Sequence, residues 1–117
     1  MNTTLPPTSL DYTTSDRLTF EIIDGMVPYF GEDKREEIQT VIWETYLFAR
    51  EAHGDQVRKS GEPYITHPLE AAKLLLKLRP DIVTVQSCIL HDVIEDTPRT
   101  EEDIARLFGK NVADICQ

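Results

Sequence analysis

A histidine and three carboxylates close an apolar run in the segment HDVIEDT, residues 91–97. An unpaired charge in a hydrophobic environment costs on the order of several kcal/mol, so such a cluster requires a compensating partner. His91 and Asp92 are adjacent and diverge by about 100° on a helix, yet a nitrogen and an oxygen can still reach one ion across that edge. The pair alone is compatible with a metal site and equally with a structural role.

A second histidine could supply another nitrogen ligand. His67 stands before Pro68 at the start of a predicted helix, so it comes from a different element. Alone, such a histidine is more typical of a capping or hydrogen-bonded loop residue. Together with His91 and Asp92 it favours a metal centre, and two histidines with one carboxylate suit manganese, iron or zinc better than magnesium or calcium. His53, at the end of an earlier helix, is interpreted as an anchor for the following loop.

Two further acids follow the histidine–aspartate pair by one helical turn. Glu95 is four residues after His91, and Asp96 is four residues after Asp92. The alternative is that both acids simply face solvent, although negative charge is unfavourable near the C-terminus of a helix. The spacing therefore favours a role for Glu95 and Asp96 in acting on water or on a leaving group.

Arg58 and Lys59 form a basic pair in the loop that precedes His67. Guanidinium and ammonium groups bind phosphate oxygens well, so the pair could receive a phosphate group. A solvated pair of loop charges is an equal alternative.

The composition limits the class of protein. The chain has 117 residues, of which 40% are hydrophobic and 28% charged, as is typical of one globular domain. The net charge of −9 argues against a nucleic-acid partner but allows a phosphate substrate at a local basic patch. Cys88 and Cys116 lack metal-ligand spacing and are expected to be free thiols in a reducing cytoplasm. No apolar run approaches the ~20 residues that span a bilayer, so we expect no membrane partner.

The elements that must position these residues are all predicted to be helices. Residues 1–15 are expected to form a flexible leader ahead of one domain over residues 16–117. Ser15 or Asp16 is expected to cap the first helix. Its buried face should contain Leu18, Ile22, Ile23, Met26 and Val27.

A second helix is predicted within residues 31–54 and ends at Gly54. Its packed face is expected to hold Ile38, Val41, Ile42, Thr45 or Tyr46, Leu47 and Ala49. An ordered loop should follow at residues 55–66. The next predicted helix, residues 68–78, is apolar on almost every side and should therefore be central.

The segment with the histidine and carboxylates ends a helix predicted over residues 81–95, with Thr97 just beyond it. Thr100 and Asp103 have the spacing of a capping box, which predicts a short further helix. Residues 111–117 begin another helical pattern. No segment has the alternation of a strand, so the predicted fold class is all-α.

Two stretches, AHGDQVRKSGEPYITHP at residues 52–68 and ILHDVIEDT at residues 89–97, resemble the hydrolase domain of the Rel/SpoT family. These enzymes act on guanosine tetraphosphate and pentaphosphate, the alarmones of the stringent response. The resemblance runs from about Thr45 to Cys116. It implies an HD-type metal-dependent phosphohydrolase fold, removal of the 3′-pyrophosphate from (p)ppGpp, and Mn²⁺ as the usual metal.

The resemblance also implies roles for individual residues. His67, His91 and Asp92 correspond to three metal ligands. Glu95 and Asp96 match an acidic pair assigned to catalysis, where it positions or activates the attacking water.

The same resemblance assigns Arg58, Lys59 and Ser60 to the stretch that lines the nucleotide site. The fourth metal ligand of the family is an aspartate on a later helix, well beyond residue 117. We therefore expect an N-terminal fragment with impaired hydrolase activity, whose exposed apolar face pairs with another copy. The alternatives are an HD phosphohydrolase for another nucleotide and a non-catalytic helical module with a binding or regulatory role.

Overall fold

The structure is a computed structural model that describes residues 10–116. Within these residues the fold is all-α, as the sequence predicts, and the only bridge between extended segments joins Val57 and Pro63. The elements are α1 (Thr13–Phe30), η1 (Glu32–Lys34), α2 (Arg35–His53), α3 (Thr66–Leu75), η2 (Leu76–Leu78), α4 (Ile82–Leu90), α5 (Val93–Asp96), α6 (Glu101–Phe108) and α7 (Lys110–Cys116).

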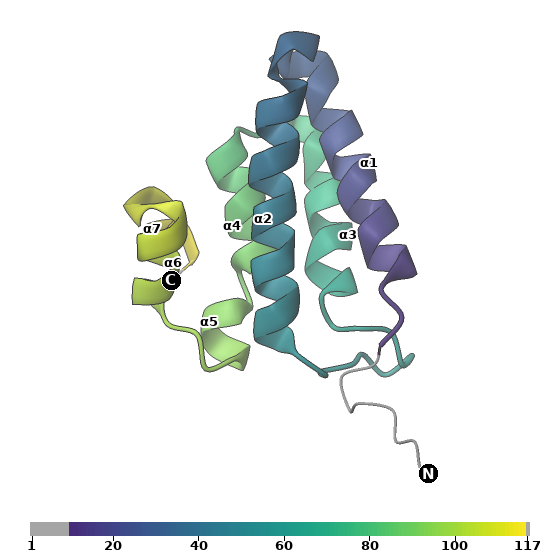
Figure 1. Cartoon of the computed structure of the whole chain (residues 1–117), viewed down its shortest axis with the longest axis vertical. Helices are drawn as coiled ribbons and strands as arrows, with labels where there is room; N and C mark the ends of the chain where they lie inside the picture. Colours follow the sequence, from purple (N-terminus) through teal and green to yellow (C-terminus); the bar gives the residue numbers. More distant parts are fainter. Residues whose placement is uncertain (1–9, 117) are drawn as a thin grey trace.

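Figure 1 shows α1 and α2 as long antiparallel neighbours with α3 and α4 packed behind them. The helices α6 and α7 lie together beside α4, and the single turn of α5 lies near the C-terminal end of α2. No helix in the described part of the chain is both long enough and apolar enough to cross a membrane.

Buried hydrophobic side chains from each of the α-helices described in residues 10–116 form one core. The five apolar positions predicted for the first helix are all buried. On α2 the predicted residues Ile38, Ile42 and Ala49 are buried, and so are both Thr45 and Tyr46. Each large apolar side chain removed from water contributes about 1.5–3 kcal/mol, so this core is the main source of stability.

The first helix begins earlier than predicted. It starts at Thr13, so its first turn lies inside the segment predicted as a leader, and residues 1–9 of that segment lie outside the described residues. Neither Ser15 nor Asp16 is its cap, because both are used in contacts with α2. The Ser15 hydroxyl is buried 2.7 Å from the hydroxyl of Tyr46.

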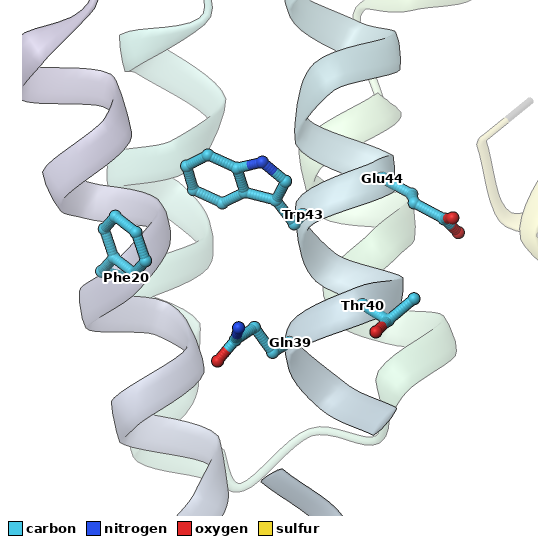
Figure 2. A pocket seen from close by; sticks show the side chains of 5 residues that line it. All are labelled: Phe20, Gln39, Thr40, Trp43 and Glu44. Carbon is cyan, nitrogen blue, oxygen red and sulfur yellow. The ribbon is translucent and has the colours of Figure 1, made fainter. Parts of the chain in front are cut away.

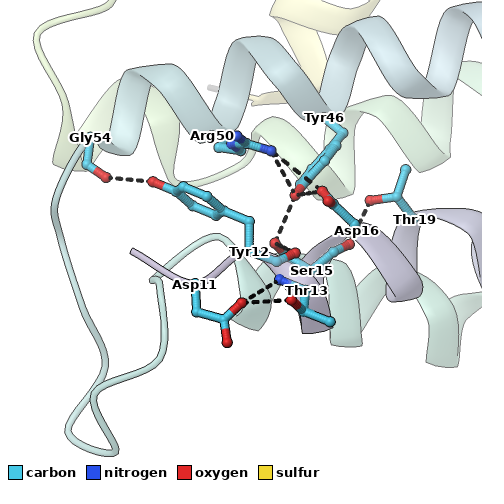
Figure 3. Close-up of polar contacts among 9 residues, drawn as sticks. All are labelled: Asp11, Tyr12, Thr13, Ser15, Asp16, Thr19, Tyr46, Arg50 and Gly54. Carbon is cyan, nitrogen blue, oxygen red and sulfur yellow. Dashed lines mark hydrogen bonds and ion pairs between the residues drawn. The ribbon is translucent and has the colours of Figure 1, made fainter. Parts of the chain in front are cut away.

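A polar cluster ties the start of α1 to the last turns of α2, as Figure 3 shows. Tyr46 donates a hydrogen bond to the Asp16 carboxylate at 2.6 Å. The Arg50 guanidinium lies 3.3 Å from the same carboxylate oxygen and 3.8 Å from the centre of the Tyr12 ring. The Tyr12 hydroxyl donates to the carbonyl of Gly54 at 3.4 Å. Because Gly54 opens the next loop, α1 helps to fix where that loop starts.

Two predictions about apolar faces are wrong. Leu47 is 41% exposed because it lies about one position away from the buried stripe of α2. The helix predicted over residues 68–78 is not central: α3 gives way to η2 after Leu75, and Leu74 and Leu78 are 64% and 77% exposed. This helix packs against α1 and α4 and buries Leu69, whereas Leu74 and Leu78 stay at the surface.

The helix predicted over residues 81–95 is broken in the structure. Asp81 caps α4 by accepting a hydrogen bond from the Thr84 amide, but α4 ends at Leu90. His91 and Asp92 separate it from α5, a single turn that ends at Asp96. No glycine or proline marks the break. It coincides with side-chain contacts made by Asp92 to a distant part of the chain.

The predicted capping box is confirmed. The Thr100 hydroxyl accepts from the Asp103 amide, and the Asp103 carboxylate accepts from the Thr100 amide. Gly109, with a φ of 100°, ends α6, and α7 follows at once.

Candidate active site

The loop of residues 54–65, the basic loop, is ordered by its own backbone hydrogen bonds. The Arg58 amide donates to the Glu62 carbonyl, and the Gly61 amide donates to the Arg58 carbonyl, both at 2.8 Å. Gly54 turns the chain out of α2 with φ 58° and ψ −123°, a conformation that a residue with a Cβ rarely adopts. The prediction of an ordered loop between the two helices is confirmed.

Tyr64, at the end of the basic loop, connects it to the break between α4 and α5. Its hydroxyl donates to Oδ2 of Asp92 at 2.8 Å, and Nδ1 of His91 lies 3.0 Å from the other carboxylate oxygen. Burial, followed by the hydrogen bond to Asp92, raises the pKa of Tyr64 to about 12. Tyr64 is therefore a protonated donor at neutral pH, and Asp92 is its acceptor.

Asp92 is held in its ionised form by its neighbours. Partial burial acts to raise the pKa of its carboxyl group, but the hydrogen bonds from Tyr64 and His91 and the charges of His91 and His67 outweigh burial. The pKa of Asp92 therefore lies below its usual range. The side chain of Asp92 is 18% exposed and that of His91 is 66% exposed. The histidine ring is therefore open to solvent, whereas the carboxylate beside it is largely buried.

His67 lies on the same side of the molecule, in the first turn of α3. Its ring centre is 5.9 Å from that of Tyr64, and its amide donates to the Tyr64 carbonyl at 3.0 Å. The structure thus puts His91 and Asp92 in contact and His67 beside the tyrosine that binds Asp92.

In residues 10–116, no three His, Cys, Asp or Glu side chains are arranged so as to hold an ion. The chemistry of the predicted ligands nevertheless fits a divalent transition metal, because His67 and His91 offer imidazole nitrogens and Asp92 an ionised carboxylate. His91 and His67 are both exposed, so their rings are accessible from solvent. The assignment of these three residues as ligands stays a prediction.

Glu95 and Asp96 are both exposed on α5. The carbonyl of Asp96 accepts a 2.6 Å hydrogen bond from the side-chain amide of Gln56 in the basic loop. The acidic pair and the basic loop are thereby joined directly.

Arg58 is not a freely solvated loop charge. Its guanidinium lies 3.0 Å from Glu70 of α3 and 3.7 Å from Glu62 of its own loop. Lys59 and Ser60 are exposed at the tip of the basic loop, and the Ser60 hydroxyl is 3.4 Å from the Glu62 carboxylate. The sequence did not indicate that Arg58 already contacts two carboxylates.

The hollow drawn in Figure 2 lies elsewhere, between α1 and α2. Phe20 and Trp43 both border it, and their ring centres are 4.9 Å apart. A second hollow reaches the predicted site, since it is bordered by His91, Cys88 and Ile115. Of these two hollows, the second is the one that a predicted ligand, His91, borders.

Residues 45–117 match the HD domain family. The chain belongs to this family. HD hydrolases bind divalent metal ions, which agrees with the donor set of His67, His91 and Asp92.

Curated relatives of this HD domain confirm the predicted resemblance to the Rel/SpoT family. The chain is 43% identical over 99 residues to the bifunctional (p)ppGpp synthase/hydrolase SpoT of Escherichia coli K12, a match over 84% of this chain and 14% of that protein. It is 48% identical over 82 residues to the guanosine-3′,5′-bis(diphosphate) 3′-pyrophosphohydrolase of Aquifex aeolicus, which covers 70% and 11%. It is 34% identical over 98 residues to the GTP pyrophosphokinase rsh of Brucella ovis, covering 84% and 12%. The chain therefore spans at most 14% of the length of these relatives.

Two residues of the HD domain that matter for the site were missed by sequence reasoning. Tyr64 stands three residues before His67, and a tyrosine so close to a predicted ligand was a usable signal. Gln56 carried no signal for its contact with Asp96, which is 40 residues away in the sequence. The predicted role of His53 as a loop anchor is confirmed: it is buried, and its Nδ1 lies 2.9 Å from the side-chain oxygen of Gln56.

Proposed function

We propose that this HD domain belongs to a metal-dependent guanosine-3′,5′-bis(diphosphate) 3′-pyrophosphohydrolase. The reaction adds water across the ester bond at the 3′ oxygen, so that pyrophosphate leaves and the 3′ hydroxyl is restored. The observation that carries the proposal is the contact of Asp92 with both Tyr64 and His91. That contact joins the basic loop to the histidine–aspartate pair in a region 43–52% identical to enzymes with this name.

His67, His91 and Asp92 would hold the metal, which we propose to be Mn²⁺. When bound, such an ion supplies a Lewis acid that polarises a phosphoryl oxygen. The contribution of the chain itself is orientation: Tyr64 fixes one oxygen of Asp92, leaving the other toward His91. Hydrogen-bonded partners of this kind hold a ligand in place before an ion arrives.

Glu95 and Asp96 would act on the attacking water. Both carboxylates are exposed and stand within one turn of Asp92, so a solvent molecule can reach them. A carboxylate in this position can orient the water and accept its proton as the new phosphorus–oxygen bond forms.

Arg58, Lys59 and Ser60 would bind the phosphates of the substrate. The Arg58 guanidinium pairs with the carboxylates of Glu70 and Glu62. Phosphate oxygens could take their place, because carboxylates and phosphates both offer paired anionic acceptors. The substrate would compete with Glu70 for Arg58.

We also propose that the protein acts in the cytoplasm, on a nucleotide rather than on nucleic acid, and self-associates. The two free thiols support a cytoplasmic location. The net charge of −9 supports a nucleotide substrate rather than a nucleic acid. Exposed leucines on α3 and η2, together with Ile115 at 54% exposure, support self-association. Light scattering at several protein concentrations tests self-association, and a monomer at every concentration would contradict it.

The proposed activity is tested by incubating the purified chain with ppGpp and Mn²⁺ and measuring pyrophosphate. Slow release that requires both Mn²⁺ and His91 is expected, in line with the impaired activity predicted for this chain, with His91→Ala as the control. A panel with GTP and other nucleotides separates this function from that of an HD phosphohydrolase for another nucleotide. The absence of both pyrophosphate release from ppGpp and ppGpp binding in the presence of Mn²⁺ would contradict the proposal.

A further inference from the structure

Gln56 contacts three separate segments of the site. Its side-chain nitrogen donates to the Asp96 carbonyl at 2.6 Å, and its side-chain oxygen lies 2.9 Å from Nδ1 of His53. Its backbone carbonyl accepts from the amide of Tyr64 at 2.9 Å. One residue of the basic loop thus joins the end of α2, the end of α5 and the tyrosine that binds Asp92.

The direction of these hydrogen bonds follows from the chemistry of the groups. A carbonyl can only accept, so the Asp96 carbonyl requires the NH₂ group of Gln56. The remaining oxygen of the Gln56 amide must accept, so Nδ1 of His53 carries a proton. His53 is only 3% exposed and lies in the last turn of the long helix α2. The chain of hydrogen bonds therefore starts from a buried ring.

The two segments joined by Gln56 expose the side chains predicted to carry the chemistry. The helix α5 is four residues long and exposes both of its acids. The tip of the basic loop, with Lys59 and Ser60, is also exposed. Gln56 is two residues before Arg58, so a bond from its side chain to Asp96 fixes the loop and the acidic turn relative to each other.

We propose that Gln56 is a positioning residue that sets the separation between the phosphate-binding side of the site, Arg58 and Lys59, and the water-activating side, Glu95 and Asp96. This inference rests on the proposed function. Gln56 need not touch the substrate. It acts through the backbone of Asp96 and through the ring of His53.

The test compares three variants of the full chain. Gln56→Leu removes both side-chain bonds, whereas Gln56→Glu keeps an acceptor for His53 and loses the donor to Asp96. Gln86→Leu is the matched control, because the Gln86 amide also bridges two helices, donating to the Thr45 hydroxyl at 3.1 Å inside the core. Each variant is measured for kcat and KM with ppGpp and Mn²⁺, and for amide hydrogen exchange.

Both Gln56 variants are expected to lower kcat by about 10- to 100-fold with a much smaller change in KM, because misplaced catalytic groups affect the chemical step most. Gln86→Leu should lower the unfolding midpoint and leave kcat of the folded enzyme unchanged. An unchanged kcat in Gln56→Leu, or wild-type behaviour of Gln56→Glu, would overturn the proposal while leaving the hydrolase function intact.

Hydrogen exchange separates failure of this inference from failure of the proposed function. The amides of Asp96 and Thr97 close α5 by donating to Asp92 and Val93, and they should exchange severalfold faster in Gln56→Leu than in Gln86→Leu. If the wild-type chain neither hydrolyses nor binds ppGpp, the proposed function is wrong, and the positioning role of Gln56 is judged by hydrogen exchange alone. Equal exchange rates of the Asp96 and Thr97 amides in Gln56→Leu and Gln86→Leu would then overturn the positioning role of Gln56 as well.

Discussion

The hydroxyl of Tyr64 lies 2.8 Å from Oδ2 of Asp92, although the two residues are 28 positions apart in the sequence. This bond spans the gap between the basic loop and the break that follows α4. Its acceptor is a carboxylate whose pKa is lowered, and a hydrogen bond to an ionised group is stronger than one between neutral groups. The orientation of Asp92 therefore depends on a residue outside its own helix.

Replacing Tyr64 by Phe should weaken Mn²⁺ binding by about tenfold, because the carboxylate loses the donor that orients it. The stability of the fold should change by no more than about 1.5 kcal/mol, the usual net value of one hydrogen bond. Titration calorimetry with Mn²⁺ and thermal unfolding measure the two quantities. Tyr29→Phe is the control, since Tyr29 donates to the Pro80 carbonyl at 2.8 Å away from the site. Equal Mn²⁺ affinities in the two variants would contradict the role of Tyr64.

Replacing His91 by Ala should abolish Mn²⁺-dependent hydrolysis and leave the helix content unchanged. The side chain is 66% exposed, so its removal should change the free energy of unfolding by less than about 0.5 kcal/mol. Circular dichroism checks the fold, and Mn²⁺ binding checks the site. Lys77→Ala, a change at an exposed position on η2, is a suitable control. Full Mn²⁺ affinity in His91→Ala would remove this residue from the metal site.

Replacing Glu70 by Gln should lower the KM for ppGpp by about two- to fivefold, because a competing carboxylate worth about 0.5–1 kcal/mol is withdrawn from Arg58. Arg58→Ala should shift KM in the opposite direction. The control is Asp24→Asn, which removes a carboxylate 2.9 Å from Arg35. A KM that is the same in Glu70→Gln and the wild type would show that Arg58 does not meet the substrate.

Ionisation of Tyr46 should unfold the start of α1 at high pH. Burial, with a smaller contribution from the Asp16 carboxylate, raises the pKa of Tyr46 to about 12. A raised pKa means that the protonated phenol stabilises the fold below pH 10, the usual pKa of tyrosine, and that this stability is lost as the pH rises through 12. The ultraviolet absorbance of the ionised phenol, compared between the wild type and Tyr46→Phe, should show this late titration. A difference spectrum that appears near pH 10 would contradict it.

The helices could be predicted wherever the signal was local. The apolar positions of α1 recur at helical spacing, and Thr100 with Asp103 forms a capping box, so neighbours in sequence determine both features. The run that contains Leu74 and Leu78 was misinterpreted because leucines on every side give no information about which face will meet a neighbour. Periodicity identifies a helix but cannot orient one that is apolar all round.

The predicted site residues were chosen by type and spacing, and these signals could not reveal the break at His91 and Asp92. That break is associated with Tyr64, whose contact with Asp92 no local rule indicates. The contact of Gln56 with Asp96 could not be predicted for the same reason, since the two residues are 40 positions apart. Residues that carry chemistry can be recognised from their types, whereas residues that orient them are recognised only when distant segments meet.

The distant contacts of Tyr64 and Gln56 also determine when the site can form during folding. Closing a chain segment of 28 or 40 residues costs more conformational entropy than forming the local bonds of a helix. The helices α1 and α2 and their shared core can pair early, because they are adjacent in sequence. The carboxylate of Asp92 finds its donor only after α3 and α4 have docked. A chain that is still folding would therefore carry all of its ligands and acids without the arrangement that could attack a nucleotide.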